Sequence, residues 1–168
     1  MAELKPQERL QPALLDRLMD DEPDKKVESR DKRVLNRTQM RQAALRDLGW
    51  LFNATCMGGL AGHTYAENSV VNFGLPPLSG ETASTLDVIE LEGTIRHAIL
   101  TFEPRIMPES LQVEALVSDL QLNHHSVVSI QIRGNLWAHP LPIELLLRTE
   151  LDLETGAVEV RDLGRSGL

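Results

Sequence analysis

Apolar residues recur at intervals of three and four in two separate stretches of the chain. This spacing places them on one face of a helix, so it predicts helices over residues 37–54 and 82–101. Pro104 ends the second helix, because the residue before a proline is pushed out of the helical region. The apolar positions are Met40, Ala44, Leu48 and Leu51 in the first stretch, and Val88, Leu91, Ile95, Ala98, Ile99 and Phe102 in the second.

The last third of the chain alternates apolar and polar residues instead. A period of two is typical of a strand with one buried and one solvated face. The alternating stretches are residues 112–118, 128–133, 143–152 and 158–161. Gly156 follows Glu154 and Thr155, where a tight hairpin turn needs a left-handed residue. Helices followed by strands favour an α+β domain. We expect two main helices packed on one face of a mostly antiparallel sheet of three to four strands.

Turn-forming and charged residues divide the rest of the chain. Residues 60–81 are rich in Gly, Pro and Asn, which predicts an irregular loop held to the core by its apolar side chains. These are Val70, Val71, Phe73, Leu75 and Leu78. Residues 1–36 combine a short amphipathic helix with a linker of mixed charge, which is expected to be solvated. The helix could dock on a partner or fold back on its own domain, and both interpretations stay open. The expected organisation is an N-terminal arm over 1–36, one domain over 37–163 and a tail over 164–168.

Charge is unevenly distributed, and it narrows the range of partners. Residues 1–50 carry 11 Lys and Arg against 10 Asp and Glu, whereas residues 51–168 carry 6 against 15. An acidic domain repels phosphate backbones, so we expect no nucleic-acid partner. No apolar run approaches the roughly 20 residues of a membrane span, and the charged first residues are unlike a secretory leader. Cys56 is the single cysteine, so we expect a cytoplasmic protein without direct membrane insertion.

Candidates for metal or nucleophilic chemistry are few. His124 and His125 are adjacent, and neighbouring residues of a strand point to opposite faces, so they would not bind one ion together. The spacing of Cys and His does not supply the three or four convergent ligands that zinc needs. Cys56 follows an apolar helix face, which favours a small packed residue over a nucleophile. We therefore expect no metal site and no cofactor.

Carboxylates near the second helix introduce glycoside hydrolysis as a further hypothesis, since that chemistry needs two facing acids. Glu90 and Glu92 are two positions apart on a helix and so point in different directions. Glu103 is followed by Arg105, whose charge would keep it ionised, whereas an acid catalyst has a raised pKa. This pattern does not favour hydrolysis, and we expect no catalytic residue.

The tripeptide Glu103-Pro104-Arg105 is the most distinctive local feature. A turn stiffened by proline loses little conformational entropy when it docks. Its guanidinium and carboxylate are strong hydrogen-bonding groups. Arg105 could equally pair with Glu103 inside the protein, as an internal clamp. The residues alone leave both interpretations, docking turn and internal clamp, equally open.

Five segments spread over nearly the whole chain resemble one known family, in the order of that family. They are residues 11–18 (QPALLDRL), 45–53 (LRDLGWLFN), 69–76 (SVVNFGLP), 102–106 (FEPRI) and 149–156 (TELDLETG). Through them the chain resembles the small baseplate wedge protein of contractile injection machines, the sheath initiator. Within that family it is most similar to the E subunit of bacterial type VI secretion baseplates. Pro77 and Ile106 depart slightly from the usual acidic residue and leucine of the family.

The resemblance implies a structural subunit rather than an enzyme. Relatives contact the core bundle of larger wedge subunits through a Glu-Pro-Arg turn. That turn matches Glu103, Pro104 and Arg105 here and favours the docking interpretation. Arms of sheath subunits add strands to the sheet of these relatives, and the short strand over 158–161 would offer such an edge. The implied location is the cytoplasmic baseplate of a membrane-docked secretion apparatus.

Two alternatives remain. The family has also been labelled lysozyme-like, so one alternative is a peptidoglycan hydrolase that uses Glu103 or Glu90. The other is a generic adaptor that works through its amino-terminal helix. In that case, deletion of residues 1–36 would abolish all partner binding rather than a part of it.

Overall fold

The computed structural model describes residues 12–18, 24, 35–58, 62–77, 88–116 and 127–164. The helices are α1 (Leu14–Leu18), α2 (Arg37–Asn53), α3 (Thr64–Glu67) and α4 (Val88–Phe102), with the 3-10 helices η3 (Val70–Asn72) and η4 (Pro108–Ser110). The strands are β1 (Gln112–Leu116), β2 (Val127–Leu136), β3 (Ile143–Asp152) and β4 (Val158–Asp162). His124, His125 and Leu78 lie outside the described residues.

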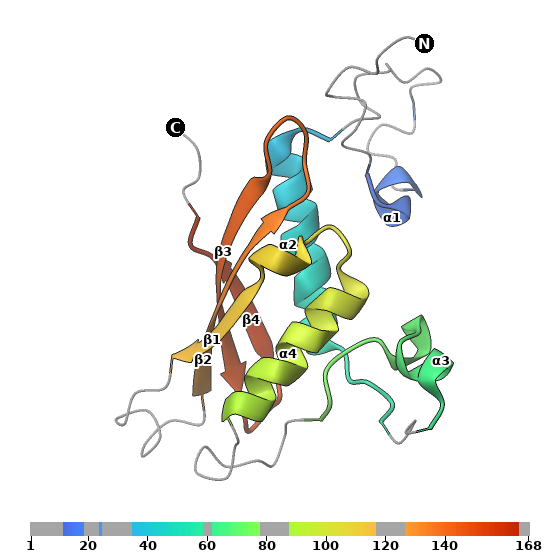
Figure 1. Ribbon diagram of the computed structural model, residues 1–168, viewed down its shortest axis with the longest axis vertical. Coiled ribbons are helices and arrows are strands. Elements are labelled where there is room, and N and C mark those ends of the chain that lie inside the picture. Colours follow the sequence, from blue (N-terminus) through green and yellow to red (C-terminus); the bar gives the residue numbers. More distant parts are fainter. Residues whose placement is uncertain are drawn as a thin grey trace.

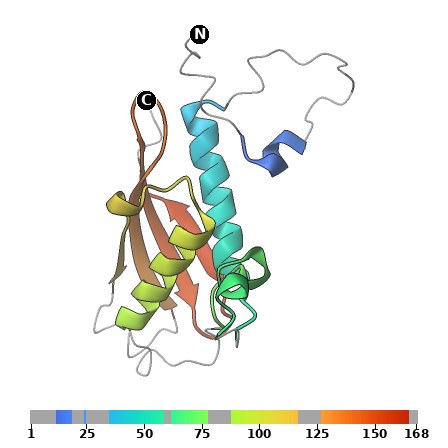
Figure 2. The same cartoon turned by 45° about the vertical axis from the view of Figure 1, so that its right-hand side comes forward.

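The four strands form one antiparallel sheet in which chain order is also spatial order, β1-β2-β3-β4. The two main helices, α2 and α4, pack on the same side of this sheet, with α2 beside β4 and α4 crossing over toward β1 (Figures 1 and 2). The α+β fold expected from the sequence is therefore confirmed. Gly156, with a φ of 72°, lies in the turn between β3 and β4 as the pattern predicted.

The core lies between the helices and the inner face of the sheet. Helix α4 buries Leu91, Ile95, Ala98 and Ile99, and α2 buries its own apolar stripe around Leu48. The buried residues of the strands alternate along β2 and β3, and they include Ile130, Ile132, Leu136, Leu145, Leu147 and Leu151. Burial of this apolar area is the main force that holds the two layers together.

Helix α2 has well-defined ends. The side chain of Asn36 accepts the backbone N–H of Gln39 at 2.8 Å, and Gln39 accepts that of Asn36 at 3.0 Å, which forms a capping box. The helix ends at Asn53, before the glycines that follow. This happens because Thr55 pairs with Leu75 in a parallel bridge, so the chain is already extended at Ala54.

The described part of the loop between the main helices contains two short helices, α3 and η3, which its composition did not predict. Phe73 packs edge-to-face on Phe102 with ring centroids 5.3 Å apart, and Leu75 is buried. Val70 and Val71 were expected to pack as well, but they are 82% and 63% exposed. The prediction was wrong for these two because the 3-10 helix η3 turns both side chains outward.

Candidate functional site

The Glu103-Pro104-Arg105 turn is joined to the end of β2 by backbone hydrogen bonds. Helix α4 ends at Phe102, and the N–H of Ile106 donates to the carbonyl of Glu103 at 3.1 Å, which closes the turn. Ile106 then pairs with Leu136 in an antiparallel bridge. The N–H of Trp137 donates to the carbonyl of Arg105 at 2.8 Å. The turn is therefore held on both sides by regular structure.

Within the turn, the Glu103 carboxylate binds the side chain of Arg105 at two points. Glu103 is only 4% exposed. Its Oε1 accepts from Nε of Arg105 at 2.6 Å and from the backbone N–H of Arg105 at 3.2 Å, while its Oε2 pairs with Nη2. The contacts of an internal clamp are thus present. A two-point guanidinium–carboxylate pair of this kind is rigid and directional.

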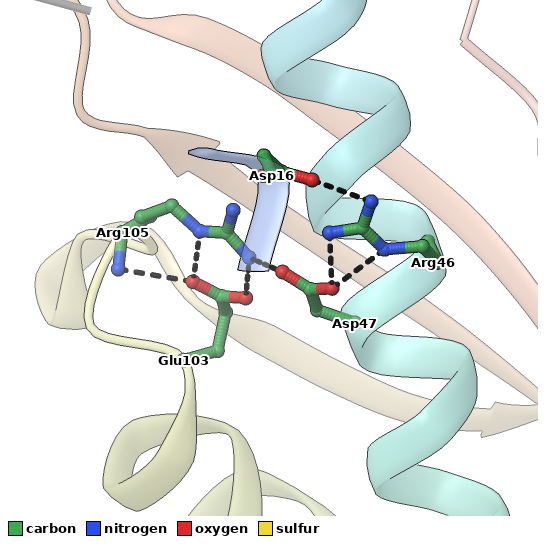
Figure 3. A network of polar contacts seen from close by, with 5 residues as sticks. All are labelled: Asp16, Arg46, Asp47, Glu103 and Arg105. Carbon is green, nitrogen blue, oxygen red and sulfur yellow. Dashed lines mark hydrogen bonds and ion pairs between the residues drawn. The ribbon is translucent and has the colours of Figure 1, made fainter. Parts of the chain in front are cut away.

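This pair continues into a network that reaches the N-terminal arm (Figure 3). Nη2 of Arg105 also donates to Oδ2 of Asp47 on α2 at 2.6 Å. Oδ1 of Asp47 accepts from Nε and Nη2 of Arg46 at 3.0 and 2.8 Å. Nη1 of Arg46 then donates to Asp16 on α1 at 2.6 Å. Three carboxylates and two guanidiniums therefore connect α1, α2 and the turn.

The charges of the network stabilise one another. Burial lowers the pKa of the Arg105 guanidinium. The carboxylates of Glu103 and then Asp47 raise it by more than burial lowers it, so the pKa lies above its usual range. For Arg46, the hydrogen bond to Asp16 is the largest influence, and it raises the pKa despite partial burial, with Asp47 adding to the effect. The network thus favours the charged form of both guanidiniums.

The residues exposed at the turn differ from the charged residues that form the network. Pro104 is exposed, whereas Glu103 is buried and Arg105 is partly buried. Trp137, whose backbone bonds to Arg105, is 55% exposed. The sequence pattern gave no indication of Trp137 or Asp47, because the first depends on how β2 pairs with the turn and the second on how α2 packs beside it.

Two of the carboxylates considered for catalysis bind partners within the domain. Glu92 accepts the backbone N–H of Ala115 at 2.7 Å, while Glu103 pairs with Arg105. A hollow of about 260 Å³ lies between the end of α2 and the turn before β4. None of its lining residues carries a carboxylate; they are Phe52, Asn53, Ala54, Thr55, Leu75, Pro76, Pro77, Leu151, Thr155, Gly156, Ala157 and Val158.

The candidate metal ligands and the single cysteine can be placed only within the described part of the chain. No group of three or more His, Cys, Asp or Glu residues suited to a metal ion occurs there. Cys56 is a half-buried free thiol, and its backbone N–H donates to Leu75. Among the same residues, no helix is both long and apolar enough to cross a membrane.

Comparison with known proteins identifies one family. The family model described as baseplate wedge protein gp25 matches residues 38–141, more than half of the 168 residues of the chain. No curated protein and no solved structure matches the chain significantly. The match covers α2, α4, the Glu103-Pro104-Arg105 turn and the first two strands. The chain belongs to the baseplate wedge protein gp25 family, a family of structural baseplate proteins.

Proposed function

We propose that this protein is a non-enzymatic subunit of a type VI secretion baseplate wedge. It binds larger wedge subunits through the Glu103-Pro104-Arg105 turn and initiates assembly of the contractile sheath at the open edge of its sheet. It acts in the cytoplasm, in the baseplate of a membrane-docked apparatus. Family membership supports assembly with other baseplate subunits, and the five sequence segments support the type VI assignment.

The observation that best supports docking is that the charged side chains of the turn bind each other, while the proline between them is exposed. Glu103 and Arg105 bind each other, so their charges fix the backbone, and Pro104 stands exposed at the tip of a rigid base. A preformed loop binds with a smaller entropic cost than a flexible one. The backbone of Trp137 bonds to Arg105, and its side chain is exposed; tryptophan is enriched among the residues that dominate binding energy.

This arrangement reconciles the two interpretations of the turn. The clamp positions the loop, and the loop presents Pro104, Trp137 and the exposed part of Arg105 to a partner. Charge reversal of Arg105 would place a second carboxylate beside the buried Glu103, so it would disturb folding as well as binding. Pro104 and Trp137 are therefore the better positions for a binding test.

Co-purification from cells tests the proposal. A tagged chain should recover the larger wedge subunits, identified by mass, and Trp137→Ala should reduce this recovery while leaving the unfolding midpoint almost unchanged. Deletion of residues 1–36 should remove only part of the binding, since the Glu103-Pro104-Arg105 turn lies outside the arm. Recovery of no baseplate subunit would contradict the proposal, and loss of all binding on deletion would favour an adaptor that works through its arm.

A hydrolase remains testable in the same preparation. Clearing of peptidoglycan in a zymogram that disappears in Glu103→Gln would contradict the non-enzymatic assignment. We expect no clearing, because Glu103 is buried and paired with the guanidinium of Arg105. Hydrolysis requires two accessible acids.

A further inference from the structure

The backbone of β4 alternates between groups that bond to β3 and groups that point away from the sheet. The N–H of Asp152 donates to Ala157 at 3.0 Å, and that of Leu163 donates to Leu146 at 2.8 Å. These contacts fix the phase of the antiparallel ladder. Val158, Val160 and Asp162 are paired with Leu151, Thr149 and Leu147, and all three direct their backbone N–H and C=O outward.

At Val158, both outward groups are already occupied by one side chain. The carboxamide of Asn53, the last residue of α2, donates from Nδ2 to the carbonyl of Val158 at 2.8 Å. Its Oδ1 accepts the N–H of Val158 at 3.0 Å. These are the two hydrogen bonds that a residue of an adjacent antiparallel strand would make. The same Nδ2 also donates to the carbonyl of Gly49 at 2.8 Å, which fixes the amide against its own helix.

Beyond Val158, α2 lies beside β4 without bonding to its outward backbone groups. Arg41 binds the side chain of Asp162 at 2.5 Å rather than its backbone. Within the described part of the chain, no hydrogen bond reaches the outward backbone groups of Val160 and Asp162. At the opposite edge, α4 bonds to one residue of β1 and to the residue just before that strand: Glu92 accepts the N–H of Ala115 at 2.7 Å, and Arg96 donates to the carbonyl of Leu111 at 2.5 Å.

We propose that Asn53 is a stop for strand addition: it takes the place of the strand residue opposite Val158, so an extended segment of a partner subunit pairs with β4 at Val160 and Asp162 only. The proposal rests on the sheath-initiating function proposed above and names the residue that sets the register. An unguarded edge would accept a strand in several registers, because backbone groups carry no sequence information. A fixed stop at one end leaves a single starting point.

Amide hydrogen exchange measured by NMR on the full chain, alone and in complex with the purified sheath subunit, tests this. In the free chain, the Val158 amide should exchange slowly and those of Val160 and Asp162 rapidly. Binding should slow exchange at Val160 and Asp162 by at least about tenfold, the effect of one added hydrogen bond. Val158 and the side-chain amide of Asn53 should not change.

Two variants sharpen the test. In Asn53→Ala, the Val158 amide should exchange rapidly in the free chain and become protected on binding, because the added strand now reaches it. In Glu92→Ala, the matched control on the other edge, only Ala115 should exchange faster, and the response of β4 to binding should be that of the wild type. A chain that forms no complex would overturn both this proposal and the proposed function. Binding without protection at Val160 and Asp162, or with a shifted Asn53 amide, would overturn this proposal alone.

Discussion

At the scale of single residues, the Glu103 carboxylate determines the shape of the turn. It is buried, and it binds both the side chain and the backbone N–H of Arg105. Both oxygens of this carboxylate are engaged by Arg105. Removal of one partner of a buried ion pair leaves the other charge without compensation, which costs more than the pair itself contributes.

Glu103→Gln should therefore destabilise the protein by about 2–3 kcal/mol, because the guanidinium of Arg105 loses its chelating anion. The free energy of unfolding, measured with urea, checks this value. Glu159→Gln is the matched control, since Glu159 makes a similar pair with Arg161 but on the fully exposed face. We expect almost no change for the control. Equal effects of the two substitutions would mean that the Glu103 pair is energetically a surface pair.

A second residue-scale prediction concerns the turn between β3 and β4. Oδ1 of Asp152 accepts the backbone N–H of Glu154 at 2.8 Å and that of Thr155 at 3.1 Å. These bonds, chiefly the one from Thr155, lower the pKa of Asp152 below its usual value of 3.8. A lowered pKa in the folded state stabilises the protein above the unfolded-state pKa, and this contribution is lost as the pH falls through the folded-state value.

Asp152→Asn should consequently reduce stability at neutral pH and have progressively less effect as the medium is acidified below about pH 4. Thermal unfolding of both proteins between pH 3 and pH 7 measures the difference. A difference that stays constant over this range would show that the charge of Asp152 contributes nothing to the turn.

At the scale of elements, the crossing between the end of α2 and the loop depends on one glycine. Gly74 has a φ of 127°, and a Cβ at this position would overlap the backbone carbonyl of Ala54. The close approach allows the N–H of Leu75 to donate to Ala54 at 2.9 Å and that of Cys56 to donate to Leu75 at 2.9 Å. This pairing is what ends α2 at Asn53.

Gly74→Ala should cost about 3 kcal/mol of unfolding free energy, because a left-handed backbone and a steric overlap are both imposed. Gly93→Ala is the control. It lies inside α4 with no atom within 4 Å of the added Cβ, so it should stabilise the protein by up to about 1 kcal/mol through helix propensity. Denaturant unfolding distinguishes the two. A neutral Gly74→Ala would contradict the close packing of this crossing.

Periodicity was sufficient to predict α2, α4 and the four strands, because each has one face toward the core. The buried stripe of α4 and the alternation of β3 are direct consequences of that burial. The outward-facing Val70 and Val71 were not predictable, since their hydrophobicity is the same whether η3 turns them in or out. The pairing of Arg105 with Glu103 was one of two interpretations of the sequence. The bond from Arg105 to Asp47 was not predictable, because the two residues are 58 positions apart in the chain.

At the scale of the whole molecule, each of the two main helices bonds to the backbone at one edge of the sheet. Helix α2 contacts the backbone of β4 through Asn53, and α4 contacts that of β1 through Glu92. The Glu103-Pro104-Arg105 turn follows α4 in the chain and is hydrogen-bonded to the residues at the end of β2. The protein thus offers one stiff turn and one partly open edge as separate surfaces, which suits a subunit that joins two kinds of partner.

The affinity of purified wedge subunits for wild type, Pro104→Glu and Pro77→Glu tests the central claim most directly. Both prolines are exposed, so the same substitution is made on and away from the turn. We predict that Pro104→Glu weakens binding on the order of a hundredfold, changes the unfolding free energy by less than about 1 kcal/mol, and that Pro77→Glu binds as the wild type does. Wild-type affinity in a folded Pro104→Glu variant would contradict the docking role of the turn.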